Sequence, residues 1–234
     1  MDDAPDPLAL HVRPTTARPL LGVTILLVED SRYASEGMRL LCLRSGARLR
    51  RADCLRSARR HLKTYRPTAA IIDLGLPDGA GVDLIEELAT SIPRLPAILG
   101  FSGALEGEEA AIAAGADGFL AKPLTRLAEF QQALLAHLPD QAMRSGPRSV
   151  PEAEVTPDSL ALQDDLAHVR SLLTSDDDPV AQAYTAQFLH ALAVSSSDAA
   201  LAEAAHRLTT DNAPATLTRV RRLVDARIGP KHAV

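Results

Sequence analysis

Three short apolar runs, each with a polar residue at or near its carboxyl end, constrain the fold of this chain most strongly. They are VTILLVED (Val23–Asp30), AAIIDL (Ala69–Leu74) and PAILGFS (Pro96–Ser102). An unbroken apolar run of this length, rich in β-branched residues, is typical of a strand buried on both faces of a parallel sheet. Parallel strands need crossover connections, so the segments between the runs are expected to contain helices.

Helical patterns do lie between these runs, and two weaker strand patterns complete the series. The additional strands are ARLRRADC and GFLA, and the helices are Ser31–Ser45, Leu55–Tyr65, VDLIEELAT, EGEEAAIAAG and Thr125–Leu138. Strand and helix therefore alternate five times. This alternation predicts an α/β domain over residues 22–138, with a doubly wound, five-stranded parallel sheet.

The segments outside this domain predict a flexible arm, a linker and a second domain. Residues 1–21 carry acids, Pro and Arg without a continuous apolar core, which predicts a flexible N-terminal arm and no signal peptide. Residues 139–157 are rich in Pro, Ser, Arg and Glu and have no period, which indicates a linker. Residues 158–230 are predicted to form a small all-α helical bundle. Its four amphipathic helices are expected at Ser159–Thr174, Pro179–Val194, Asp198–Thr210 and Thr216–Ile228.

The charge and the cysteine content indicate where the protein is located and which classes of partner it can bind. The two cysteines, Cys42 and Cys54, are too few for a disulfide framework and suit a reducing, cytoplasmic location. No apolar run reaches the roughly 18 to 20 residues that a membrane helix needs, so no membrane partner is expected. The formal net charge is −5, and from Asp140 onward nine Lys and Arg residues face thirteen Asp and Glu residues. Nucleic acid is therefore an unlikely partner for the chain as a whole.

Polar residues at the strand ends indicate the chemistry, because ligands of doubly wound sheets bind beyond the carboxyl ends of the strands. These residues are Glu29, Asp30, Asp73, Ser102 and Lys122. Three carboxylates in one place repel one another unless a cation lies among them, and all-oxygen ligands favour Mg²⁺. Lys122 and Ser102 would add a positive charge and a hydroxyl to the same cleft. The set predicts phosphoryl transfer, with one carboxylate as the nucleophile.

The motifs ILLVEDS, IIDLGLPDGAGVDLIEEL, ILGFSG and AGADGFLAKP carry a family resemblance. With them, the segment from Val23 to about Leu138 resembles the receiver domain of two-component response regulators, which has a flavodoxin-like fold. The resemblance implies that Asp73 is the phosphoacceptor. It also implies that Glu29, Asp30 and Asp73 hold Mg²⁺, helped by the backbone carbonyl of Gly75.

Other residues receive their expected roles from the same resemblance. Ser102 would be the hydroxyl that moves toward the phosphoryl group, and Phe119 the aromatic side chain that follows this switch. Lys122 would pair with the phosphate, and the Lys122–Pro123 peptide bond would be cis. Two departures are visible: the stretch from Ser102 to Gly115 is about two residues shorter than is usual, and Phe101 is bulkier than expected. Neither departure is expected to touch the phosphorylation chemistry directly.

The resemblance also implies partners. A sensor histidine kinase or a phosphotransfer protein would donate the phosphoryl group to Asp73. The face formed by the fourth helix, fifth strand and fifth helix often dimerises or contacts the output in this family, so a homodimer is among the expected assemblies. A dedicated enzyme is not expected, because a dehalogenase-like phosphatase needs a second carboxylate at position 75, where this chain has Gly. The expected catalysis is limited to the receiver's own phosphorylation and dephosphorylation.

Three functions stay open for the helical bundle. The first is an interaction or dimerisation module. The second is phosphotransfer by His206, since Ala205–Leu208 resembles the motif of histidine phosphotransfer domains, although Thr209 and Thr210 replace its Lys and Gly. The third is DNA binding through the arginines of the last helix, which are Arg219, Arg221, Arg222 and Arg227.

Overall fold

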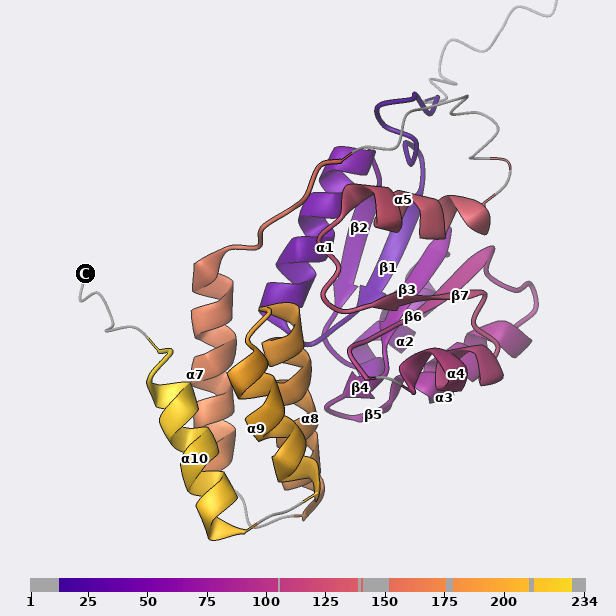
Figure 1. The fold of residues 1–234 in the computed structure, drawn as a ribbon. Helices are drawn as coiled ribbons and strands as arrows, with labels where there is room; N and C mark the ends of the chain where they lie inside the picture. Colours follow the sequence, from indigo (N-terminus) through magenta and orange to yellow (C-terminus); the bar gives the residue numbers. More distant parts are fainter. Residues whose placement is uncertain are drawn as a thin grey trace, which may run out of the picture.

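The structure of the chain is a computed structural model that describes residues 13–104, 106–138, 140, 152–175, 179–210 and 213–228. It consists of an α/β unit and a helical bundle that lies beside it (Figure 1). The elements of the α/β unit are β1 (Thr24–Val28), α1 (Arg32–Ser45), β2 (Arg48–Ala52), α2 (Leu55–Thr64), β3 (Ala69–Asp73), β4 (Gly75–Leu76), β5 (Gly79–Ala80), α3 (Gly81–Thr90), β6 (Ala97–Ser102), α4 (Gly107–Ala113), β7 (Gly118–Ala121) and α5 (Leu127–Ala136).

The main sheet has five parallel strands in the order β2-β1-β3-β6-β7. Its order reverses at β1, so the chain winds in two directions, and the predicted doubly wound α/β fold is confirmed. β1 and β3 are neighbours, and Val28 at the end of β1 lies opposite Ile72. The residues that follow Val28 and Ile72, which are Glu29 and Asp73, must therefore lie close together at the carboxyl edge of the sheet.

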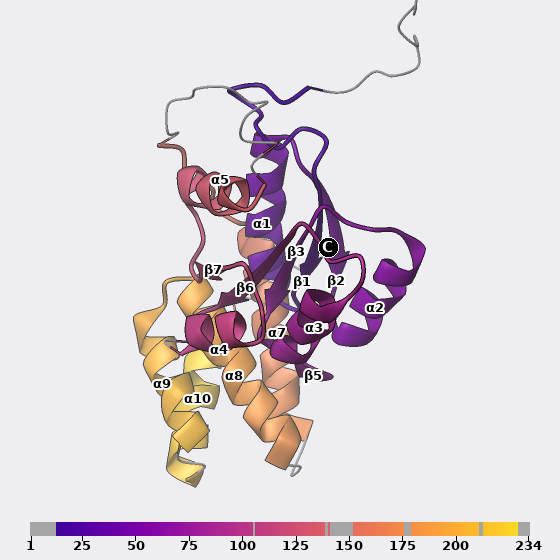
Figure 2. The ribbon, with the colours of Figure 1, turned by 90° about the vertical axis from the view of Figure 1, so that its right-hand side faces the viewer.

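Two hydrophobic cores hold the helices against the sheet, one on each face. Alternate residues of β1 serve different cores: Ile25 and Leu27 pack with α1 and α5, whereas Leu26 and Val28 pack with α2, α3 and α4. The two groups of helices are seen on opposite sides of the strands in Figure 2. This double burial explains why the central strands lack the polar alternation of a sheet with one wet face.

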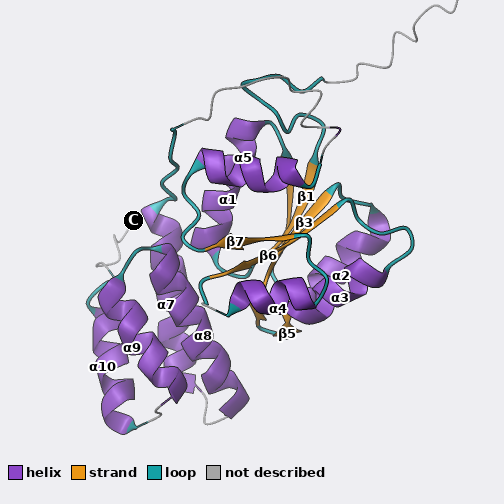
Figure 3. Ribbon diagram, turned by 45° about the vertical axis from the view of Figure 1, so that its right-hand side comes forward, coloured by secondary structure: helices purple, strands orange, loops and turns teal. Residues whose placement is uncertain are grey.

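The bundle comprises α7 (Ser159–Ser175), α8 (Pro179–Ser195), α9 (Ala199–Thr210) and α10 (Pro214–Asp225). The four helices lie together on one side of the α/β unit (Figure 3). Their core contains Leu166, Val169, Leu189 and Val224, all almost fully buried. The four expected helices are present. The last one begins and ends earlier than expected, because Pro214 is in its first turn, where the missing N–H of proline costs nothing.

The described parts of the arm and of the linker contain residues that pack against the α/β unit. Residues 1–12, 139 and 141–151 lie outside the described residues. Leu20 was expected in the flexible arm, but it is fully buried and its N–H donates to Ser45 O at 2.9 Å. Val155 was expected in the linker, but it is buried too and its N–H donates to Thr125 O at 2.9 Å. The α/β unit therefore begins before Gly22, and the second half of the linker packs against it.

In the part of the chain that the structure describes, no helix combines the length and the apolarity that crossing a membrane requires.

Candidate active site

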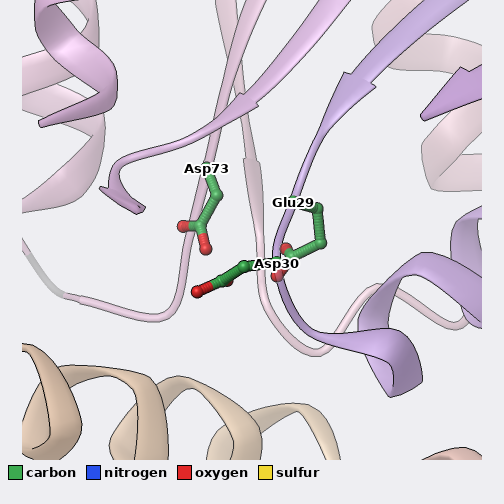
Figure 4. A group of neighbouring side chains, drawn as sticks. All are labelled: Glu29, Asp30 and Asp73. Carbon is green, nitrogen blue, oxygen red and sulfur yellow. The ribbon is translucent and has the colours of Figure 1, made fainter. Parts of the chain in front are cut away.

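Three carboxylates converge where β1 and β3 end (Figure 4). Glu29 and Asp30 follow β1, and Asp73 is the last residue of β3. Each of the three places a carboxylate oxygen within 4.8 Å of the others. The predicted acidic cluster is therefore assembled by the pairing of two adjacent parallel strands.

Lys122, which follows β7, neutralises part of this charge. Its Nζ lies 2.7 Å from Glu29 Oε2 and 3.0 Å from Asp73 Oδ2, and all three side chains are buried. Burial favours the neutral amine, but the carboxylates of Asp73 and Glu29 outweigh it and raise the pKa of Lys122. The Lys122–Pro123 peptide bond is cis, as expected.

The carboxylates remain hard to ionise despite Lys122. Burial raises the pKa of Asp73 to about 7, with Lys122 opposing the shift and the Glu29 charge adding to it. Burial likewise raises the pKa of Asp30 to about 6. One lysine therefore does not compensate three carboxylates in this buried site.

The acidic cluster has the features of a site for a hard divalent cation. Asp30 Oδ1 is buried and has no hydrogen-bond partner among the described residues. Such an atom is costly unless a cation or a water satisfies it. The carboxylates of Glu29, Asp30 and Asp73 and the backbone oxygen of Gly75 would supply the all-oxygen ligand set that suits Mg²⁺. The residues present thus fit the predicted ion.

Phe101, which the sequence marks as unusually bulky, lies next to the site. Lys122 Nζ lies 4.7 Å from the centroid of the Phe101 ring, within the range of a cation–π interaction. The ring is buried beside the lysine. Phe101 therefore contacts the cationic group that binds Asp73, and the expectation that it does not touch the phosphorylation chemistry directly stays a prediction.

Ser102 and Phe119 are adjacent, as a switch pair requires. A Cβ atom added to Gly107 would lie 3.0 Å from Ser102 Cβ and 3.2 Å from Phe119 Cζ. Ser102 Oγ accepts a hydrogen bond from the N–H of Ala104 at 3.1 Å, so the hydroxyl currently caps its own loop. The next helix, α4, has seven residues, in agreement with the shortened stretch noted in the sequence.

The bundle supplies further residues to this site that the sequence did not reveal. A cavity of about 40 Å³ lies over the acidic cluster and is lined by receiver-side residues and by Gln187, Phe188, His190 and Ala191 of α8. Tyr184, on the same helix, donates its hydroxyl to Asp30 Oδ2 at 2.5 Å. No motif marks these residues, because single polar residues on a helix carry no signal until the tertiary structure places them.

His206, the candidate phosphotransfer residue, is exposed on α9. Its ring centroid lies 5.8 Å from that of His190. Within the described chain, His190 lines the cavity over Asp73 and His206 does not. Exposure agrees with the hypothesis that His206 carries a phosphoryl group, but it does not test it, and the role stays a prediction.

The arginines expected on the last helix divide into two groups. Arg221 donates to Leu173 O at 2.5 Å, and Arg227, just beyond α10, forms an ion pair with Asp198, so both serve the bundle itself. Arg219 and Arg222 are exposed. A nucleic-acid surface on α10 would therefore rest on fewer cations than the sequence offered.

Comparison with known proteins agrees with this geometry. Residues 25–134 match the family described as the response regulator receiver domain. These residues form a receiver domain. The match includes the ends of β1, β3, β6 and β7, where the acidic cluster, Ser102 and Lys122 lie.

Similar proteins include several named transcriptional regulators. The chain is 34% identical over 100 residues to the KDP operon transcriptional regulatory protein KdpE of Escherichia coli K12. This alignment covers 42% of this chain and 44% of KdpE. It is 31% identical over 100 residues to the virulence transcriptional regulatory protein PhoP of Salmonella typhimurium. That alignment covers 42% of this chain and 45% of PhoP. The chain therefore spans less than half the length of these relatives.

Solved receiver structures match about half of the chain. One is the receiver domain of the sensor histidine kinase PA1611 from Pseudomonas aeruginosa PAO1, described with a magnesium ion in its active-site cleft. It has 29% identity, a TM-score of 0.46, and coverage of 50% of this chain and 98% of that one. Another is a putative response regulator from Chloroflexus aurantiacus, with 27% identity, a TM-score of 0.47, and coverage of 50% of this chain and 98% of that one.

Proposed function

We propose that this chain is a two-component response regulator whose receiver domain accepts a phosphoryl group on Asp73. The observation that carries the proposal is the buried cluster at the carboxyl edge of the sheet, in which Lys122 bonds Asp73 beside Glu29 and Asp30. The expected donor is a phosphohistidine of a sensor kinase or of a phosphotransfer protein. The C-terminal bundle would then act through protein–protein contacts.

The proposed step is a direct displacement at phosphorus. An Asp73 carboxylate oxygen attacks the phosphorus, a P–O bond forms, and the N–P bond of the donor breaks, leaving its electron pair on the imidazole. Lys122 would shift from the Asp73 carboxylate to a phosphoryl oxygen, and the Ser102 hydroxyl would donate to another. A bound Mg²⁺ would supply charge neutralisation for the phosphoryl oxygens. When the other ring nitrogen of the donor carries a proton, the group that leaves is neutral imidazole, so no separate acid is needed to protonate it.

The test is phosphoryl uptake from acetyl phosphate in the presence of Mg²⁺, followed by intact mass spectrometry of the whole chain. The wild type should gain one phosphoryl group, and Asp73→Asn should gain none. Asp83→Asn is a matched control, because Asp83 is an exposed carboxylate on α3 of the same domain. Equal uptake by the wild type and Asp73→Asn would overturn the proposal.

The position of the label separates this function from a relay. A label that base or hydroxylamine removes is an acyl phosphate, as expected on Asp73. An acid-labile, base-stable label that disappears in His206→Ala would show that the bundle carries the phosphoryl group instead.

A second candidate, regulation of transcription through DNA binding, is favoured by the names of the relatives KdpE and PhoP. Against it, the bundle region beyond residue 140 is acidic. A shift of duplex DNA that weakens steeply with salt, and weakens further in Arg219→Ala, would support this candidate.

A further inference from the structure

The bundle docks on the receiver domain at the edge where the phosphorylation chemistry is proposed. Asp165 of α7 is buried and accepts three hydrogen bonds from the start of α1: Ser31 Oγ at 2.8 Å, Arg32 N–H at 3.1 Å and Tyr33 N–H at 3.0 Å. The N–H groups of a first helical turn have no partner within the helix, and a carboxylate there is favourable. A residue more than 130 positions away thus completes the cap of the helix that follows Glu29 and Asp30.

Helix α8 lies across the acidic cluster itself, and a faint orange helix runs below the three carboxylates in Figure 4. Tyr184 donates its hydroxyl to Asp30 Oδ2 at 2.5 Å. Gln187 lies against Gly75, because a Cβ atom added to that glycine would come within 2.5 Å of Gln187 Nε2. These contacts cover two of the residues that would hold Mg²⁺.

The contact continues along α8 to the loop after β6. A Cβ atom added to Gly103 would lie 3.3 Å from Val194 Cβ. Tyr184, Gln187 and Val194 follow one another at spacings of three and seven residues, so they share one face of α8. The cavity left between this face and Asp73, about 40 Å³, has room for a few water molecules.

We propose that this face of α7 and α8, made of Asp165, Tyr184, Gln187 and Val194, is a receiver-docking surface that competes with the phosphodonor for the acidic edge. The occupant of the edge in the resting chain is the chain's own bundle. A donor histidine and Asp73 must approach to bonding distance, and α8 occupies the path between them. The inference rests on the proposed function, because it assumes that Asp73 is the phosphoacceptor.

A reversible disulfide tests the competition in the full-length protein. In a Cys54→Ser background, Gly103→Cys with Val194→Cys should form a cross-link, because the Cβ separation of 3.3 Å is close to the roughly 3.5 to 4.5 Å of natural disulfides. The oxidised protein should take up phosphoryl groups from acetyl phosphate at least about tenfold more slowly than the same protein after reduction, a coupling of ordinary size. Equal rates before and after reduction would overturn the competition.

A second pair of variants tests the same inference from the opposite direction. Asp165→Ala removes the three bonds to α1 and should speed phosphoryl uptake about fivefold or more, within the usual range of coupling between sites. Asp164→Ala is the control, because Asp164 is the neighbouring residue and its ion pair with Arg32 is exposed and contributes little. Equal rates for the two variants would contradict the inference. If the reduced, Asp165→Ala and wild-type proteins all take up no phosphoryl group, the proposed function itself has failed.

Discussion

At the scale of single residues, Lys122 decides whether the acidic cluster can be buried. Its ammonium group binds Glu29 and Asp73 at once and lies over the ring of Phe101. A buried charge without its partner costs far more than an exposed one. Removing the lysine would leave the buried carboxylates of Glu29 and Asp73 without their cationic partner.

Lys122→Met is therefore expected to lower the free energy of unfolding by about 3 kcal/mol or more, as for other broken buried pairs. Lys63→Met is the control, because Lys63 is exposed on α2. The double variant Lys122→Met/Asp73→Asn should regain part of the loss, since one of the two orphaned carboxylates becomes neutral. Urea unfolding measures all three variants. A Lys122→Met protein as stable as Lys63→Met would show that the buried pair contributes nothing.

At the scale of elements, the beginning of α9 is tied to the end of α10. Asp198 accepts a hydrogen bond from the N–H of Leu201 at 3.0 Å, as an N-cap does, and from Arg227 Nη2 at 2.8 Å. The hydrogen bond from Arg227 lowers the pKa of Asp198, against the opposing effect of its partial burial. One side chain thus joins the start of α9 to the segment that follows α10.

Asp198→Ala should lower the free energy of unfolding by about 1 kcal/mol, a typical loss for an N-cap. Asp225→Ala, an exposed change on α10, should leave it unaltered. Because the pKa of Asp198 is lower in the folded state, its contribution is fully present above the unfolded value, near pH 4. It is lost as the pH falls through the lower folded value. Thermal unfolding of both variants between pH 3 and pH 6 measures how their difference in stability depends on pH. This difference should shrink as the pH falls, and a difference that grew on acidification would contradict the prediction.

At the scale of the whole molecule, docking of the bundle and phosphorylation of Asp73 are expected to be mutually exclusive. Thermodynamic coupling between two events is reciprocal. If docking lowers the equilibrium occupancy of the site by the phosphoryl group, then occupation of the site must weaken docking by the same factor. The bundle would therefore undock when the receiver is phosphorylated. The α7–α8 face would then become available to another protein.

Hydrogen exchange measures this directly. Addition of Mg²⁺ and acetyl phosphate should speed amide exchange at the start of α1 and in α8 of the wild type. Asp73→Asn should not respond. Unchanged exchange in phosphorylated wild-type protein would mean that docking and phosphorylation are independent, whatever the rate of phosphoryl uptake.

The sequence by itself determined the receiver domain and the residues of its acidic cluster. Apolar runs fix which segments are buried strands, and the parallel order brings the strand ends together. Glu29, Asp30 and Asp73 are therefore neighbours wherever β1 and β3 pair, and no long-range detail of packing is needed to predict it.

Only the tertiary structure decided what surrounds those residues. The position of Phe101 beside Lys122 depends on how side chains fill one edge of the sheet. The cap that Asp165 forms on α1 and the bond from Tyr184 to Asp30 join two domains. The periodicity of apolar residues in a sequence shows which face of a helix is buried. It does not show which other surface that face packs against. The physical reason is that docking depends on the complementarity of two folded surfaces, and neither surface exists until its own domain has formed.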